Sequence, residues 1–167
     1  MVFAAILGND NRLLAVNRRV TDRWEPPGGY VERAETIDEA VKRTVWEATG
    51  LLVRPVILTG VYTDLGRNEV ALVFRCSLIG KDVDRRVNGA RGRWLTADEV
   101  HRLMDAPSAE RLLDAVRLGP PKIRSYDGVR LADDPSLRPA LPPQGIADHE
   151  DGVDRAEQRG GPAILDS

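Results

Sequence analysis

One segment, residues 28–51, restricts the fold of this chain more than any other. It reads GGYVERAETIDEAVKRTVWEATGL. Thr36, followed three residues later by Glu39, forms a capping box and predicts a helix that starts near residue 37. Gly50 is a typical residue to end a helix. Apolar and small residues recur between these two ends at helical spacing, namely Ile37, Val41, Thr44 with Val45, and Ala48. The segment therefore predicts an amphipathic helix that follows a glycine pair.

Short runs rich in β-forming residues lie on both sides of this helix. Before it, Val2–Leu7 and Arg12–Val16 are separated by a polar turn and predict a hairpin, and Pro26–Gly29 predicts a loop. After it, Val53–Thr63 and Glu69–Ile79 predict a second hairpin. Strands on both sides of a helix indicate an α/β domain.

The last part of the domain is predicted to be mainly helical. A short strand at Arg93–Leu95 leads into a second capping box, Thr96 with Glu99, which predicts a helix to about Asp105. A final helix is expected from about Ala109 to Leu118, followed by Gly119.

The composition changes after Gly119. Seven of the eleven prolines follow it, and Ala147–Gly161 is highly charged without apolar periodicity. Such a segment has little apolar surface to bury, so we expect a domain over residues 1–119 and a largely disordered tail over residues 120–167. Ile123–Leu131 is the part of the tail that we expect to pack on the domain.

Charge and cysteine content narrow the possible functions. The 167 residues carry a net charge of −2, which gives no electrostatic reason to expect nucleic-acid or membrane binding. The apolar start is too short for a signal peptide or a membrane span. The lone Cys76 excludes an internal disulfide and favours a cytoplasmic location, and its strand position predicts a core residue.

The carboxylates and glycines around residues 28–51 are the groups that a phosphate-hydrolysing metal site requires. Mg²⁺ and Mn²⁺ prefer oxygen ligands, and a helix presents side chains three and four positions apart on one face. Glycines let the backbone approach a metal or a phosphate closely.

This segment resembles the Nudix box. The matching positions are Gly29, Glu35, Arg43, Val45, Glu47, Gly50 and Leu51, and Trp24 with Pro27, Gly28 and Glu32 is similar to the common approach to the box. The resemblance covers roughly residues 1–118. It implies a Nudix-type α/β/α sandwich with a mixed β-sheet, a Mg²⁺ or Mn²⁺ cofactor, and hydrolysis of a nucleoside diphosphate linked to another group.

Two positions depart from the box. Thr44 and Ala48 stand where the family has glutamates, and those two positions form the metal-binding triad of the family together with that of Glu47. At 100° per residue, positions 44, 47 and 48 share one helix face. The prediction is therefore a hydrolase whose metal site is degenerate.

The candidate site residues follow from this resemblance. Glu47 and Arg43 are the catalytic candidates, with Arg43 expected to orient the box by pairing with a glutamate, or to serve only as a surface partner of Glu47 and Glu39. The metal candidates are Gly29, Glu32, Glu35 and Glu47. The substrate-binding candidates are Arg18, Arg19, Gly28, Gly29 and Trp24, although core packing of Trp24 and solvated arginines are equally open.

Two functions remain open at this point. The first is a metal-dependent hydrolase of a nucleotide sugar or nucleoside triphosphate. The second is a nucleotide-binding or regulatory module that has kept the fold and lost turnover. In both cases the partner is a small nucleotide-type molecule, and a homodimer is possible.

Overall fold

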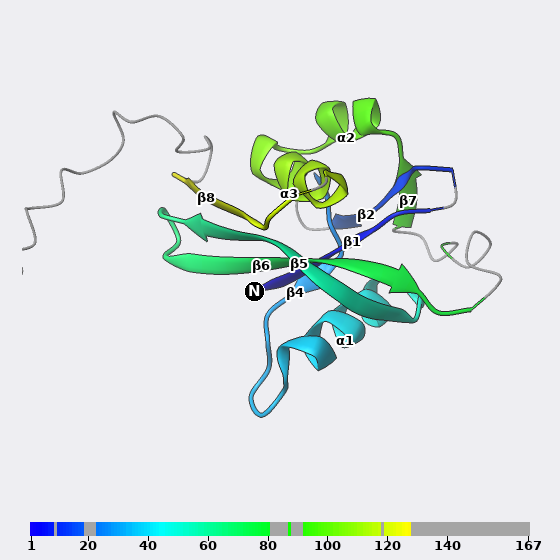
Figure 1. The fold of residues 1–167 in the computed structure, drawn as a ribbon, viewed down its shortest axis with the longest axis horizontal. Helices are drawn as coiled ribbons and strands as arrows, with labels where there is room; N and C mark the ends of the chain where they lie inside the picture. Colours follow the sequence, from blue (N-terminus) through cyan, green and yellow to red (C-terminus); the bar gives the residue numbers. More distant parts are fainter. Residues whose placement is uncertain (9, 19–22, 81–86, 88–91, 118, 128–167) are drawn as a thin grey trace, which may run out of the picture.

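Two β-sheets and three helices form the fold of the described residues (Figure 1). The computed structural model describes residues 1–8, 10–18, 23–80, 87, 92–117 and 119–127, and all structural statements concern these residues. Helices cover both faces of the larger sheet, with α1 (Ile37–Thr49) on one side and α3 (Ala106–Val116) on the other. This arrangement confirms the predicted α/β/α sandwich.

The larger sheet is mixed and has five strands in the order β4-β1-β6-β5-β8. Its members are β1 (Val2–Ile6), β4 (Gly28–Gly29), β5 (Val53–Asp64), β6 (Glu69–Leu78) and β8 (Lys122–Tyr126). Strand β1 runs parallel to β6, and β8 runs parallel to β5, while the β5–β6 and β1–β4 pairs are antiparallel. The β5–β6 hairpin is the one that the sequence predicts.

The predicted hairpin between the first two strands is wrong. Strand β2 (Leu13–Arg18) belongs to a second, antiparallel sheet with β3 (Arg23–Glu25) and β7 (Gly92–Leu95). Leu7, directly after β1, forms a single antiparallel bridge with Leu13 at the start of β2. Strand β6 pairs with all of β1, and β4 pairs with Val2 and Phe3, so β2 meets this strand only at its end, at Leu7.

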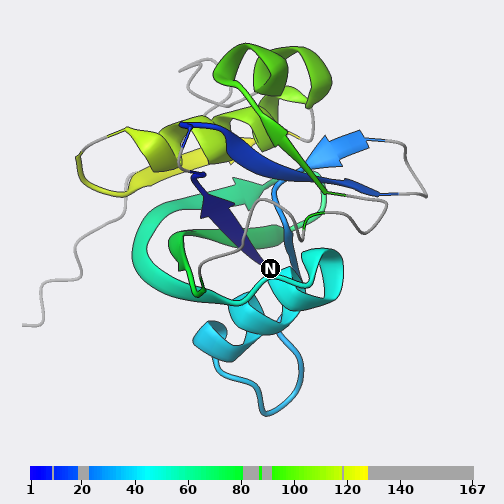
Figure 2. The ribbon, with the colours of Figure 1, turned by 90° about the vertical axis from the view of Figure 1, so that its right-hand side faces the viewer.

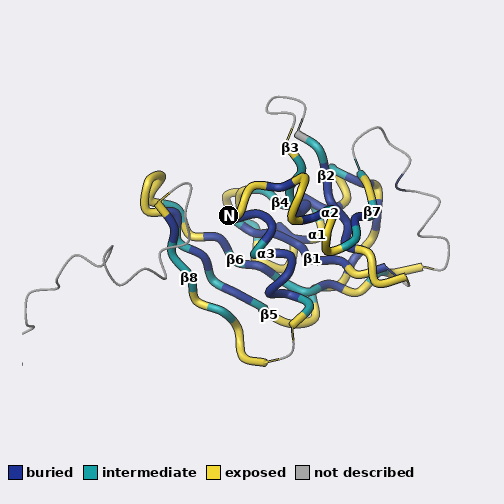
Figure 3. Tube along the Cα trace, turned by 90° about the horizontal axis from the view of Figure 1, so that it is seen from above, coloured by how far each residue is buried: buried dark blue, intermediate teal, exposed yellow. Residues whose placement is uncertain are grey.

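Two hydrophobic clusters, one on each face of the larger sheet, form the core. Alternate side chains of a strand point to opposite faces. Phe3 and Ala5 accordingly join the cluster under α3, while Val2, Ala4 and Ile6 join the cluster under α1. All five residues of β1 are buried, and Figure 3 shows this strand in dark blue.

Helix α1 has the predicted limits, and the middle of its predicted apolar stripe is buried. Thr36 and Glu39 form the capping box, and Gly50 ends the helix with a φ of 70°. The buried residues are Ala40, Val41, Thr44, Val45 and Thr49. Ile37, which the pattern places in the stripe, is instead 43% exposed. Figure 2 shows this helix below the sheet.

The C-terminal part of the domain differs from the prediction at two points. Helix α2 (Ala97–Leu103) starts at its capping box, but α3 starts at Ala106 rather than near Ala109 because the side chain of Asp105 caps it. The sheet also continues past Gly119, since β8 adds Lys122–Tyr126 to it. The predicted tail from residue 128 onward lies outside the described residues.

Cys76 is buried in the cluster under α1, and burial raises the pKa of its thiol to about 12, which suits a core residue rather than a nucleophile.

Among the described residues, no helix combines the length and the apolar character that crossing a membrane requires.

Candidate functional site

Arg43, on the solvent side of α1, is the centre of the candidate site. Its Nε and Nη2 donate to the two carboxylate oxygens of Glu35 at 2.7 and 2.9 Å. Nη2 also donates to the carbonyl oxygen of Tyr30 at 2.9 Å. Nη1 lies 3.4 Å from Glu32 and 3.2 Å from Glu47. One guanidinium therefore holds the segment after the glycines against the helix, which is the orienting role predicted from the resemblance.

Glu35 is committed to this scaffold. Besides the two bonds from Arg43, its carboxylate accepts the backbone N–H of Glu32 at 2.9 Å. The Arg43 hydrogen bonds, followed by the backbone bond, lower the pKa of Glu35 from 4.5 to about 2, and the same pairing raises the pKa of Arg43. A carboxylate with both oxygens engaged in this way is a poor metal ligand compared with Glu32 and Glu47, which are 66% and 58% exposed.

The glycine pair forms an edge strand instead of the predicted loop. Gly28 pairs with Phe3, and Gly29 pairs with Val2. A Cβ on Gly28 would lie 2.3 Å from the carbonyl oxygen of Val2, so a side chain there would clash with backbone. A Cβ on Gly29 would lie 2.9 Å from Thr44 Cγ2. These glycines allow the strand to pack closely against β1 and α1.

The three positions of the family's metal-binding triad lie in different environments. Thr44 is 5% exposed, faces Gly29, and donates its hydroxyl to the Val41 carbonyl oxygen. Ala48 is half-buried, and Glu47 points toward solvent and Arg43. The helix face that positions 44, 47 and 48 share thus extends from the core to the surface.

The available donors suit one divalent cation better than several. No group of three or more Asp, Glu, His or Cys side chains in the described part of the chain is arranged to hold a metal ion. Glu32 and Glu47 both approach Arg43 Nη1, so their carboxylates lie near each other. Mg²⁺ is commonly held by one or two carboxylates plus substrate phosphates, and two exposed carboxylates fit that requirement.

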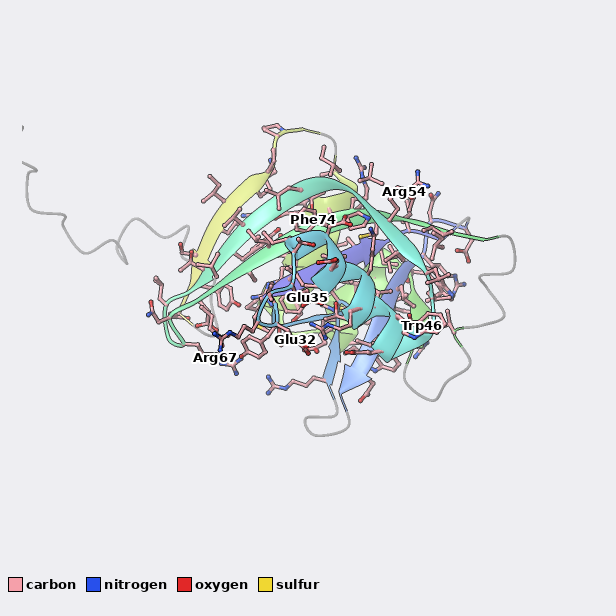
Figure 4. All side chains as sticks on the ribbon, turned by 90° about the horizontal axis from the view of Figure 1, so that it is seen from below. Glu32, Glu35, Trp46, Arg54, Arg67 and Phe74 are labelled. Carbon is pink, nitrogen blue, oxygen red and sulfur yellow. The ribbon has the colours of Figure 1, made fainter. Side chains whose placement is uncertain are left out.

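Trp24, Arg18 and Arg19 are the other site residues predicted from the sequence. Trp24 is half-buried, packs against the cluster under α3 and bridges to Met104, so its ring takes part in packing. Arg18 ends β2, and its side chain, like all of Arg19, lies outside the described residues. In Figure 4, Glu32 and Glu35 lie together beside the start of α1, with Arg67 of the β5–β6 turn on the same side.

Sequence reasoning missed the contact that ties this segment to the sheet. The Tyr30 hydroxyl donates to Glu69 at 2.6 Å, across 39 positions of sequence. Glu69 starts β6, beside the amino terminus, whose ammonium donates to the Val70 carbonyl oxygen. No local pattern links such distant residues, so only the folded chain reveals the pair.

Comparison with known proteins agrees with this geometry. The sequence matches the profile of the NUDIX domain over residues 1–116. A MutT-like protein of Streptomyces ambofaciens is 43% identical over 130 residues, which cover 78% of this chain and 84% of that protein. An ADP-ribose pyrophosphatase of Methanocaldococcus jannaschii is 34% identical over 85 residues, covering 47% of this chain and 50% of that protein.

Solved structures share the fold. The crystal structure of an ADP-ribose pyrophosphatase from Streptococcus suis superposes with a TM-score of 0.57 at 19% identity, covering 75% of this chain and 96% of that chain. A UDP-X diphosphatase gives a TM-score of 0.56 at 20% identity, covering 73% of this chain and 64% of that chain. At these identities the likeness concerns the fold alone.

Proposed function

This chain belongs to the NUDIX domain family, and from that membership we propose that it hydrolyses the diphosphate bond of a nucleoside diphosphate linked to another group. Nucleotide sugars, ADP-ribose and nucleoside triphosphates are the substrates that we propose to test, because relatives carry the names ADP-ribose pyrophosphatase and UDP-X diphosphatase. We propose a small-molecule enzyme of the cytoplasm, acting alone or as a homodimer.

The Arg43 arrangement carries this proposal. Its bonds to Glu35, Tyr30 and Glu47 keep the segment after the glycines in one position relative to α1. Ordering side chains costs conformational entropy. Several charged contacts keep this surface segment ordered before substrate binds, which suggests a preorganised site. In this assignment Arg43 and Glu35 are positioning residues, and Glu47 is the catalytic candidate.

Glu47 and Glu32 are the residues that would hold a divalent cation, together with the backbone carbonyl of Gly29. When bound, the cation would neutralise phosphate oxygens and promote ionisation of water. Glu35 is left out of the ligand set because Arg43 engages both of its oxygens. Arg43 Nη1 lies beside both proposed ligands, so a cation would have to compete with it for their carboxylates.

A substrate panel tests the proposal. Release of phosphate or mononucleotide is measured with and without Mg²⁺ or Mn²⁺, for the wild type and Glu47→Gln. We expect metal-dependent turnover that Glu47→Gln abolishes, because the amide keeps the shape and removes the anionic ligand. Asp38→Asn is the matched control, since it removes an exposed carboxylate from the same helix. This carboxylate pairs with Lys42. Equal turnover of Glu47→Gln and the wild type would remove Glu47 from the mechanism.

The substitutions at Thr44 and Ala48 favour a second candidate function, a nucleotide-binding module without turnover. Equilibrium binding separates the two candidates. Nucleotide binding that saturates without any product over the whole panel would support the module, and measurable metal-dependent product would support the hydrolase.

A further inference from the structure

Arg111, on the opposite side of the sheet from Arg43, is the most unusual charged residue of the described structure. It lies in the middle of α3 and is 7% exposed, although arginine is almost never this deeply buried without a paired acid. Its Nε is buried without a hydrogen-bond partner, and none of its nitrogens forms a hydrogen bond or an ion pair with another described residue.

Aromatic rings surround the guanidinium on several sides. Its central carbon lies 4.9 Å from the ring centroid of Phe3, 5.0 Å from that of Tyr126 and 5.8 Å from that of Tyr62. These rings come from β1, β8 and β5, three strands of the larger sheet. Cation–π contacts contribute roughly 0.5–2 kcal/mol each, but they provide no acceptor for the N–H groups.

The charge of Arg111 is compensated only at a distance. Burial lowers the pKa of Arg111, and Asp105, Asp64 and Glu25 oppose this effect through space, without an ion pair to it. Asp105 accepts the N–H of Ser108, and Asp64 accepts two backbone N–H groups of the β5–β6 turn. A buried cation without a direct partner is costly, and a bound anion is one arrangement that would satisfy its donors.

We propose that Arg111 is the anchor of a second anion site, on the α3 face of the sheet, which takes a phosphoryl group. The planar guanidinium presents paired donors that match phosphate oxygens, and its surroundings exclude most water, which strengthens the contact. Arg111 keeps 7% of its surface in contact with solvent. The group enters either as free phosphate or as the phosphate of a mononucleotide, and both sources share this chemistry.

The site is separate from the box but connected to it through one side chain. The Phe3 ring that contacts Arg111 also lies next to Gly28, where a Cβ would approach it to 2.5 Å. Because the two sites lie on opposite sides of the sheet, a ligand can occupy the Arg111 site without hydrolysis at the box.

Thermal stability with added ligands tests the proposal. The probes are inorganic phosphate, AMP and adenosine, each in excess, with the wild type, Arg111→Met and Arg111→Lys. We expect phosphate or AMP, but not adenosine, to raise the wild-type melting temperature by about 4 °C or more. Stabilisation by phosphate alone identifies free phosphate as the ligand, and stabilisation by AMP alone identifies a mononucleotide.

The variants distinguish a binding role from a structural one. Without ligand, Arg111→Met should melt at the wild-type temperature or above, because it removes an unpaired buried charge, and it should lose the ligand effect. Arg111→Lys keeps the charge without the planar fork and should bind several-fold more weakly. Arg102→Met, an exposed arginine of α2, is the matched control and should respond as the wild type does.

Three outcomes would overturn the proposal. The first is a wild type that neither phosphate nor AMP stabilises, and the second is an Arg111→Met variant with an unchanged ligand effect. The third is an Arg111→Lys variant with wild-type affinity for phosphate, which decides the matter if Arg111→Met does not fold. Glu47→Gln, which retains Arg111, should keep the phosphate effect whether or not the box is active.

Discussion

At the scale of single residues, Arg43 and Thr44 are neighbours in sequence but lie in different environments. Arg43 reaches solvent and four partners, while Thr44 turns toward Gly29 and the core. A glutamate at position 44 would need a path past Gly29, which the present packing closes. Ala48, at the rim, has more room.

Restoring the two family glutamates should therefore give opposite results. Ala48→Glu should leave the melting temperature within about 2 °C and bind Mn²⁺ about tenfold more tightly, since it adds a carboxylate near Glu47. Thr44→Glu should destabilise the fold by about 3 kcal/mol, because it places a charge at a 5% exposed position. Urea unfolding and calorimetric Mn²⁺ titration measure these effects. A stable Thr44→Glu variant with higher metal affinity would show that α1 shifts to accommodate the carboxylate.

Glu35 leads to a prediction about pH. Its pKa is lowered from 4.5 to about 2, so its pairing with Arg43 stabilises the fold fully above pH 4.5, and this contribution is lost as the pH falls toward 2. The stability difference between wild type and Glu35→Gln should therefore shrink over that window. Melting temperatures from pH 6 to pH 2 measure it, with the exposed Glu32→Gln as control. A constant difference across the window would mean that Arg43 does not stabilise the ionised form of Glu35.

At the scale of elements, a buried acid attaches β8 to α3. The Asp114 side chain is fully buried and accepts hydrogen bonds from Arg124 at 2.7 and 3.0 Å, from Tyr62 at 2.9 Å and from Arg117 at 2.9 Å. Burial alone would raise the pKa of Asp114, but the bonds from Arg124 and Tyr62 lower it overall. Three elements, β5, α3 and β8, thus meet at one carboxylate.

Removing one partner of this carboxylate should be costly. Arg124→Met should destabilise the fold by about 3 kcal/mol, because it leaves a buried anion short of its main donor. Arg117→Met, at a 53% exposed side chain, should cost under about 1 kcal/mol. Urea denaturation of both variants measures the difference. Similar losses for the two would show that β8 is not held through Arg124.

At the scale of the whole molecule, the structure moves the end of the domain. Strand β8 buries Tyr126 and extends the five-stranded sheet beyond Gly119. Residues 128–167 lie outside the described residues, and their proline-rich, charged composition still predicts little buried apolar surface.

Two truncations test where the domain ends. Deleting residues 136–167 should leave the melting temperature within about 2 °C, because the removed segment has little apolar surface to bury. Deleting residues 120–167 also removes β8 and the Arg124 contacts, so it should lower the melting temperature by about 8 °C or more. A large loss from the shorter deletion would show that the C-terminal segment packs on the domain or on a second copy.

Local sequence determined much of this protein. Both capping boxes, the limits of α1 and the β5–β6 hairpin depend on residues a few positions apart, and the spacing from Gly29 to Leu51 identified the family. The resemblance implied that Arg43 pairs with a glutamate, and the structure shows that this glutamate is Glu35.

Tertiary structure decided the rest. Strand β2 pairs with β3 and β7 instead of with β1, and Gly28–Gly29 forms an edge strand against Val2 and Phe3. The Tyr30–Glu69 contact and the contacts of Arg111 with Phe3 and Tyr62 join residues dozens of positions apart. Such contacts depend on which elements pack together, and local propensity and spacing hold no information about that choice. The sequence placed Thr44 both in the apolar stripe of the helix and on the metal face of a helical wheel, and packing against Gly29 decided that this position is buried.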